Sequence, residues 1–120
     1  MELKRVVITG IGTINPLGNT VNEYFDNLIA GVSGANLITY FDTTNYKTKF
    51  ACEVKGYNAA NYPEIFDRKE ARKLDLYSQF GMVAAYQAVM DSGLELDKID
   101  LNRAGVVWAS GIGGIRTFFD

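Results

Sequence analysis

The chain contains 120 residues, of which 48% are hydrophobic and 22% are charged, and this composition is typical of a folded globular protein. Its 12 Lys and Arg residues against 14 Asp and Glu residues give a net charge of −2, which excludes a global basic field for nucleic acid or an anionic membrane. With no His and a single Cys, the chain cannot form a His-based triad, a His zinc site, a CxxC motif or an internal disulfide.

We expect neither a signal peptide nor a membrane span. The apolar run near the N-terminus is too short and its flanks are too polar for a signal peptide. No apolar run approaches the roughly 20 residues that cross a bilayer. One Cys is compatible with a reducing compartment, and we expect a cytoplasmic protein.

The first part of the chain predicts a strand, a glycine-rich turn and a helix. Val6-Val7-Ile8 is an apolar β-branched run, which is typical of a strand buried on both faces. Thr20 with Glu23 three residues later forms a capping box, so a helix should begin there. Apolar residues at helical spacing follow, and Gly31 is a suitable stop.

The middle of the chain predicts an arm and then two helices. Residues 32–62 are rich in Asn, Thr and Tyr and indicate an irregular arm or a small hairpin, with a strand-like piece at 50–54. A basic helical piece should begin at Asp67, and Asp75 should cap a second helix over 76–91. That second helix is apolar almost all round, so we expect it to be buried on several sides.

The last part predicts another strand buried on both faces, at 104–109, which runs into the loop Ser110-Gly111-Ile112-Gly113-Gly114. The order strand, helix, arm, helix, strand indicates an α/β protein whose parallel strands are joined through helices. Two strands are too few to cover so apolar a helix.

Two motifs are better explained by structure than by function. Gly10-Ile11-Gly12 after a strand invites a dinucleotide-binding interpretation, but Asn15 stands where the third Gly is needed and the helix begins only near Thr20. A tight turn is the favoured interpretation. Cys52 has no base or helix N-terminus to lower its pKa, so we interpret it as a small, semi-buried hydrophobic residue.

Two other motifs keep a functional interpretation open. Lys69, Arg72 and Lys73 fall on one helical face, which fits either a solvated surface or a docking patch for an anionic partner. The loop 110–114 follows a buried strand, where open α/β sheets bind ligands, and it fits either simple loop punctuation or a flexible ligand-side loop.

Taken in order, these motifs resemble the β-ketoacyl-acyl-carrier-protein synthase family of thiolase-fold condensing enzymes, and its type II branch more than its type I branch. The resemblance covers essentially the whole chain. The segments that carry it are Arg5 to Gly12, Pro16 to Thr20, Ala30 to Gly34, Phe41 to Thr43, Thr48 to Ala51, Arg68 to Asp75, Gln79, Gly81, Val83, Ala84, Gln87, Ala88, Asp91 to Leu94 and Ser110 to Gly114.

The resemblance implies an α/β, thiolase-like fold, with residues 1–120 as an incomplete, N-terminal part of its layered α-β-α-β-α architecture. It implies a decarboxylative Claisen condensation of fatty acid synthesis, in which an acyl group on a Cys is extended by malonyl-acyl-carrier protein. The nucleophilic Cys and two His that stabilise the enolate and oxyanion are expected later in a longer chain. Cys52 is not that nucleophile, so residues 1–120 should be inactive alone.

The resemblance assigns two roles residue by residue. Lys69, Arg72 and Lys73 match the family's docking patch for acidic acyl-carrier protein, and Ile112 matches the residue that gates its acyl pocket. The implied partners are acyl-carrier protein, malonyl-acyl-carrier protein and a second subunit of a homodimer, with no cofactor, metal, nucleic acid or membrane. The alternatives are a non-catalytic relative, such as a chain-length partner, and a nucleotide-binding α/β domain.

Overall fold

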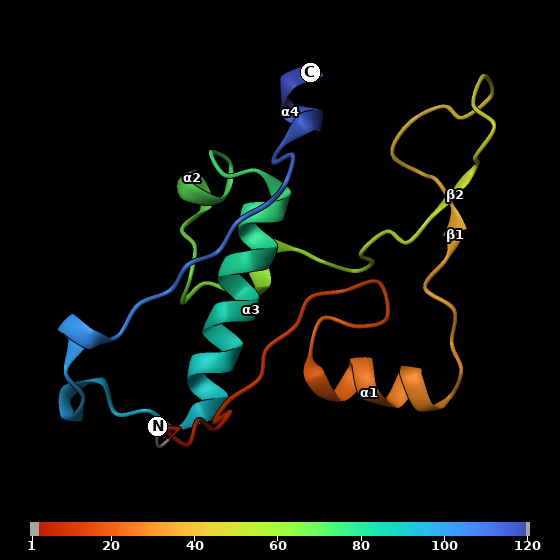
Figure 1. Cartoon of the computed structure of the whole chain (residues 1–120). Coiled ribbons are helices and arrows are strands. Elements are labelled where there is room, and N and C mark those ends of the chain that lie inside the picture. The colour runs from red at the N-terminus through yellow and green to blue at the C-terminus, as the bar shows by residue number, and fades with distance from the viewer. Residues whose placement is uncertain (1–2, 120) are drawn as a thin grey trace.

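The computed structural model describes residues 3–119, so Met1, Glu2 and Asp120 of the predicted segment 1–120 lie outside the described residues. One long helix, α3 (Leu76–Ser92), forms the centre of the arrangement, and the other segments lie around it (Figure 1). It ends at Gly93, whose φ of +61° is the left-handed conformation that favours glycine. The predicted helix over 76–91 is confirmed.

Helix α1 (Val21–Ile29) begins at the predicted capping box. The Glu23 N–H donates to Thr20 Oγ1 at 3.2 Å, and the Asn19 N–H donates to Glu23 Oε2 at 2.7 Å. Both bonds satisfy N–H groups that lack partners at a helix start. The predicted stop is also confirmed, because Gly31 has a φ of +69°.

Helix α2 (Arg68–Ala71) is a single turn. Asp67 caps it as predicted, since its Oδ1 accepts from the N–H groups of Lys69 at 2.6 Å and Glu70 at 2.7 Å. Asp75 occupies the N-cap position of α3 but makes no capping bond with its side chain. Its carboxylate instead accepts a hydrogen bond from Thr117 Oγ1, so the predicted N-cap position is confirmed but the side chain does not make the cap.

The predicted hairpin is present as a minimal one. Strands β1 (Asn36–Leu37) and β2 (Phe50–Ala51) pair antiparallel, and the arm that carries them extends away from α3 (Figure 1). Glu53, just after β2, accepts from both the N–H and the Oγ1 of Thr39, at 2.9 and 2.7 Å. The remaining elements are η1 (Ala59–Asn61), η2 (Leu96–Lys98), η3 (Leu101–Arg103) and α4 (Ile115–Phe119).

The two apolar segments predicted as strands buried on both faces are not strands in this structure. Residues 6–8 and 104–109 run without strand pairing, and Val6 and Val107 are 89% and 99% exposed. The hairpin is the one sheet among residues 3–119, and it is antiparallel. A strand needs a neighbour for its backbone N–H and C=O groups, and the described residues supply none beside either segment.

The backbone of the N-terminal segment packs instead against helix α3. A Cβ at Gly10 would lie 2.1 Å from Ala88 O, and one at Gly12 would lie 2.0 Å from Ala84 O. The Ile11 N–H donates to Asp91 Oδ2 at 2.9 Å. Glycine on one side and alanine on the other therefore permit close contact between the N-terminal segment and α3.

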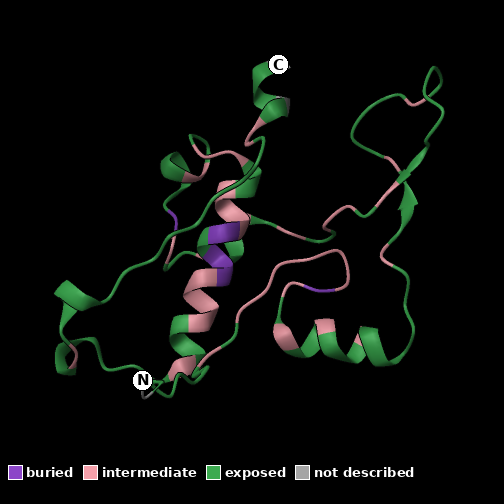
Figure 2. Ribbon diagram, in the orientation of Figure 1, coloured by how far each residue is buried: buried purple, intermediate pink, exposed green. Residues whose placement is uncertain are grey.

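The buried core is small and centres on α3. Among the described residues its hydrophobic members are Phe66, Val83 and Ala84, and most other segments are exposed (Figure 2). The accessible surface is 10022 Å², whereas a compact folded chain of 13.3 kDa leaves about 6,500 Å². The prediction that too little is present to cover α3 is confirmed. None of the helices among the described residues is both long and apolar enough to cross a bilayer.

Candidate functional site

The four basic residues of α2 and the turn after it are all exposed. Within residues 3–119 the structure records one ion pair, between Lys98 and Glu95, so none of these four is neutralised in that part of the chain. The Asp67 carboxylate is engaged by the helix N-terminus. We call this set the basic turn: Arg68, Lys69, Arg72 and Lys73.

A groove of about 640 Å³ lies beside the basic turn. Its apolar wall includes Pro63, Phe66 and Ala71, and Phe66 is only 5% exposed. Arg68 and Arg72 also line it. The basic turn therefore borders a concave surface that combines apolar contact with positive charge.

An aromatic cluster packs against α3 through Phe80. The rings of Tyr57 and Phe80 meet edge to face with centroids 4.8 Å apart, and Tyr57 stacks on Tyr62 at 5.9 Å. Burial raises the pKa of Tyr57, and the neighbouring Tyr62 adds to the shift. Burial also raises the pKa of Tyr62, helped by the negative charges of Glu23 and Glu64. Both phenols are therefore neutral at physiological pH.

Gln79 joins this cluster to the end of α2. Its Nε2 donates to Ala71 O at 2.9 Å and to Leu74 O at 3.0 Å. Its Oε1 accepts from the Tyr57 hydroxyl at 3.1 Å. The amide therefore binds three groups from two other segments.

The loop 110–114 lies at the same end of α3 as the basic turn (Figure 1). Ser110 Oγ accepts from the Gly113 N–H at 3.1 Å, and Gly113 has a φ of +74°. A Cβ at Gly114 would overlap the Asp75 carboxylate, at 2.1 Å. Ile112 is 78% exposed at the tip of this loop.

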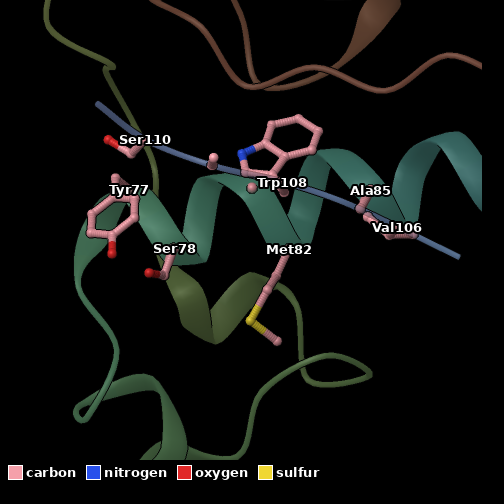
Figure 3. Close-up of a pocket in the computed structure, with 9 residues that line it drawn as sticks. Tyr77, Ser78, Met82, Ala85, Val106, Trp108 and Ser110 are labelled. Carbon is pink, nitrogen blue, oxygen red and sulfur yellow. The ribbon is translucent and has the colours of Figure 1, made fainter. Parts of the chain in front are cut away.

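A pocket of about 360 Å³ lies between α3 and the extended segment that precedes this loop (Figure 3). Trp108 lies over the helix at Gly81, where a Cβ would come within 3.0 Å of the indole Nε1. Tyr77, Met82 and Ser110 are further lining residues. Ile112 is not one of them, so the gating role predicted for it stays a prediction.

The glycine turn at 10–12 and Cys52, for which the sequence analysis favoured a structural role, do not form a functional site. Gly10 and Gly12 face the backbone of α3, which is the contact that makes glycine necessary there. Cys52 is exposed in the arm, so the expectation of a semi-buried residue is wrong. Among the described residues, no three His, Cys, Asp or Glu side chains are grouped so that they could hold a metal ion.

Sequence reasoning placed the basic turn and the loop on separate elements and did not anticipate what connects them. Asp75 and Thr117 bring the loop to the start of α3. In the sequence, Gln79 stands out only as one of the residues that carry the family resemblance. A Gln on an otherwise apolar helix was the available signal, because a half-buried amide must find hydrogen-bond partners.

Residues 3–118 match the sequence model of the family described as beta-ketoacyl synthase, N-terminal domain. The chain belongs to this family.

Several similar proteins share a name. The chain is 47% identical over 116 residues to 3-oxoacyl-[acyl-carrier-protein] synthase 2 of Vibrio cholerae serotype O1, covering 97% of this chain and 27% of that protein. It is 45% identical to the protein of that name from Coxiella burnetii, with 96% and 27% covered, and 43% identical to that from Staphylococcus aureus strain COL, with 96% and 27% covered. The chain thus spans about a quarter of the length of these relatives.

A solved structure supports the fold. The chain superimposes on the ishigamide ketosynthase/chain length factor with a TM-score of 0.65 and 35% sequence identity. The match covers 78% of this chain and 22% of that one. The ketosynthase-type, thiolase-like fold expected from the sequence is confirmed at this level.

Proposed function

We propose that this chain is the N-terminal part of a fatty-acid condensing enzyme, a 3-oxoacyl-acyl-carrier-protein synthase, and that it supplies carrier docking and part of the acyl pocket. The observation that carries the proposal is the basic turn: four exposed cations within six residues, without an ion-pair partner among the described residues, in a chain that belongs to the ketoacyl synthase family. Concentrated positive charge attracts an acidic partner and orients it.

In the proposed reaction, a Cys thiolate attacks the thioester of acyl-carrier protein, takes the acyl group and releases the carrier's thiol. Malonyl-acyl-carrier protein then loses carbon dioxide to give an enolate. The enolate carbon attacks the acyl thioester, forming a carbon–carbon bond and releasing the thiolate. This sequence contains no His, and its one Cys is exposed in the arm. The reacting groups would therefore come from other parts of the complete protein, and residues 1–120 would be inactive alone.

The loop 110–114 supplies the second proposed role. We assign Ile112 as the gate of the acyl pocket, supported by its position at the tip of a loop that contains Gly111, Gly113 and Gly114. The loop meets the start of α3 through Asp75, a few residues from the basic turn. A carrier docked on the basic turn would thus lie near the gate that its acyl chain must pass.

The test is charge reversal in the complete protein. Lys69→Glu, Arg72→Glu and Lys73→Glu together should weaken acyl-carrier-protein binding about tenfold at low salt, with a smaller difference at high salt because ions screen exposed charges. Lys47→Glu, Lys55→Glu and Arg103→Glu form the matched control, since they change the net charge equally at other exposed sites. Unchanged affinity of the first variant at low salt would overturn the docking role.

A second candidate is a non-catalytic chain-length partner. The similarity to the ishigamide ketosynthase/chain length factor favours it, because a chain length factor would share the fold. Mass spectrometry of the complete protein after incubation with an acyl donor separates the two. An acyl adduct on a Cys supports the enzyme, and its absence with a replaced Cys supports the partner.

We also propose a cytoplasmic homodimer, as the family resemblance implies. Sedimentation of the complete protein tests the dimer, and a species of one subunit's mass at micromolar concentration would contradict it.

A further inference from the structure

Gln79 is the one side chain that ties the C-terminal end of α2 to α3 among the described hydrogen bonds. Its two donated bonds end on Ala71 O and Leu74 O, which are carbonyls in the last turn of α2 and the connection after it. Carbonyls at a helix C-terminus have no partner within the helix and need one from elsewhere. Gln79 therefore acts as a C-terminal cap supplied by the next helix.

The turn that Gln79 caps cannot be stable by itself. Helix α2 has four residues, and an isolated helix of fewer than about 12 residues is marginal in water. It is fixed at its start by Asp67, which accepts the N–H groups of Lys69 and Glu70. At its end the Lys73 N–H bonds to Glu70 O at 2.9 Å, and Gln79 binds the carbonyls. Lys69, Arg72 and Lys73 are three and four residues apart, so they would share one face at helical spacing and would be separated if the turn unwound.

We propose that Gln79 is a positioning residue for carrier docking, which acts by holding the basic turn in the helical conformation that groups its charges. The inference rests on the proposed docking function of the basic turn. Tyr57 completes the arrangement, because its hydroxyl occupies Gln79 Oε1 and thereby sets which way the amide points. With Oε1 occupied, Nε2 is directed at the two carbonyls.

Three single variants of the complete protein separate the parts of this arrangement. Gln79→Met keeps the length of the side chain and removes all three bonds, and Gln79→Glu keeps an acceptor for Tyr57 but, when ionised, cannot donate to a carbonyl. Both should weaken acyl-carrier-protein binding about fivefold at low salt. Tyr57→Phe removes only the bond to Oε1 and keeps the amide that can donate to both carbonyls, so it should weaken affinity less than either Gln79 variant does. Thermal melting of each variant confirms that it is folded at the assay temperature.

A double-mutant cycle distinguishes positioning from a general structural effect. We expect Gln79→Met to have no further effect on affinity once Lys69, Arg72 and Lys73 are reversed, while its effect on the melting temperature persists in that background. Affinity losses that simply multiply in the combined variant would overturn the positioning role, as would unchanged affinity of both Gln79 variants. If reversal of the basic turn alone leaves affinity unchanged, the docking function fails first, and the result is distinct from failure of Gln79.

Discussion

Single residues decide how closely the backbone approaches α3. Gly12 lies against the helix backbone with no room for a side chain, and Ala84 and Ala88 provide the surface that receives this segment. Gly81 plays the same part beneath Trp108. These glycines are needed for space, whereas Gly31 and Gly93 are needed for their positive φ.

This difference gives a prediction at the residue scale. In the complete protein, Gly12→Ala should lower the free energy of unfolding by about 3 kcal/mol, because a Cβ 2.0 Å from Ala84 O forces backbone to move. Gly31→Ala, where a Cβ meets nothing within 4 Å, should cost only about 1 kcal/mol for its left-handed φ. Urea unfolding measures both, and a cost at Gly31 equal to or larger than that at Gly12 would contradict the packing argument.

At the scale of elements, side chains complete what short helices and strands cannot. The single turn α2 depends on Asp67 and Gln79, and the two-residue strands of the hairpin depend on Glu53 and Thr39. The Thr39 backbone N–H is the main cause that lowers the pKa of Glu53, followed by the Thr39 hydroxyl. The ionised carboxylate therefore stabilises the hairpin.

The sign of the pH dependence follows from that lowered pKa. The stabilisation by Glu53 is fully present above its unfolded pKa and is lost as the pH falls through the lower folded value. An NMR titration of the complete protein should give a pKa for Glu53 below the usual range for glutamate. Thr39→Val removes the hydroxyl and keeps the N–H, so it should raise the midpoint only part of the way. A midpoint that Thr39→Val leaves unchanged would show that the hydroxyl does not contribute.

At the scale of the whole molecule, much apolar surface is exposed. Large hydrophobic side chains in both extended segments, Val6 and Ile8 in one and Val106 and Val107 in the other, lie more than two-thirds exposed. The radius of gyration is 17.5 Å, against about 13.6 Å for a compact domain of this length. Exposed apolar surface of this extent favours association.

Residues 1–120 produced alone should therefore associate and bind a hydrophobic dye, and should show no condensing activity. Light scattering and a dye-binding assay measure these properties, and the complete protein is the control. A monodisperse monomer of residues 1–120 that melts cooperatively would contradict the prediction.

Helices α1, α2 and α3 could be predicted from the sequence, because their signals are local. The capping bond at the start of α1 joins Thr20 and Glu23, which are only three residues apart in the sequence. Gly31 and Gly93 end their helices through their own positive φ angles. The basic turn was predictable for the same reason, since one helical turn brings its charges together. The resemblance of the whole chain to the ketoacyl synthase family was also visible in the order of the sequence motifs.

The contacts between segments that are far apart in the chain could not be predicted and are known from the three-dimensional structure. No local pattern reveals that Asp75 turns from its helix to Thr117, 42 residues away, or that Gln87 and Gly12 meet in the packing of the N-terminal segment. The apolar runs at 6–8 and 104–109 show why: their sequence favours strands, but a strand exists only when a neighbouring backbone pairs with it. Strand formation requires backbone hydrogen bonds between two segments, whereas the residues of one segment show only the conformation that this segment prefers.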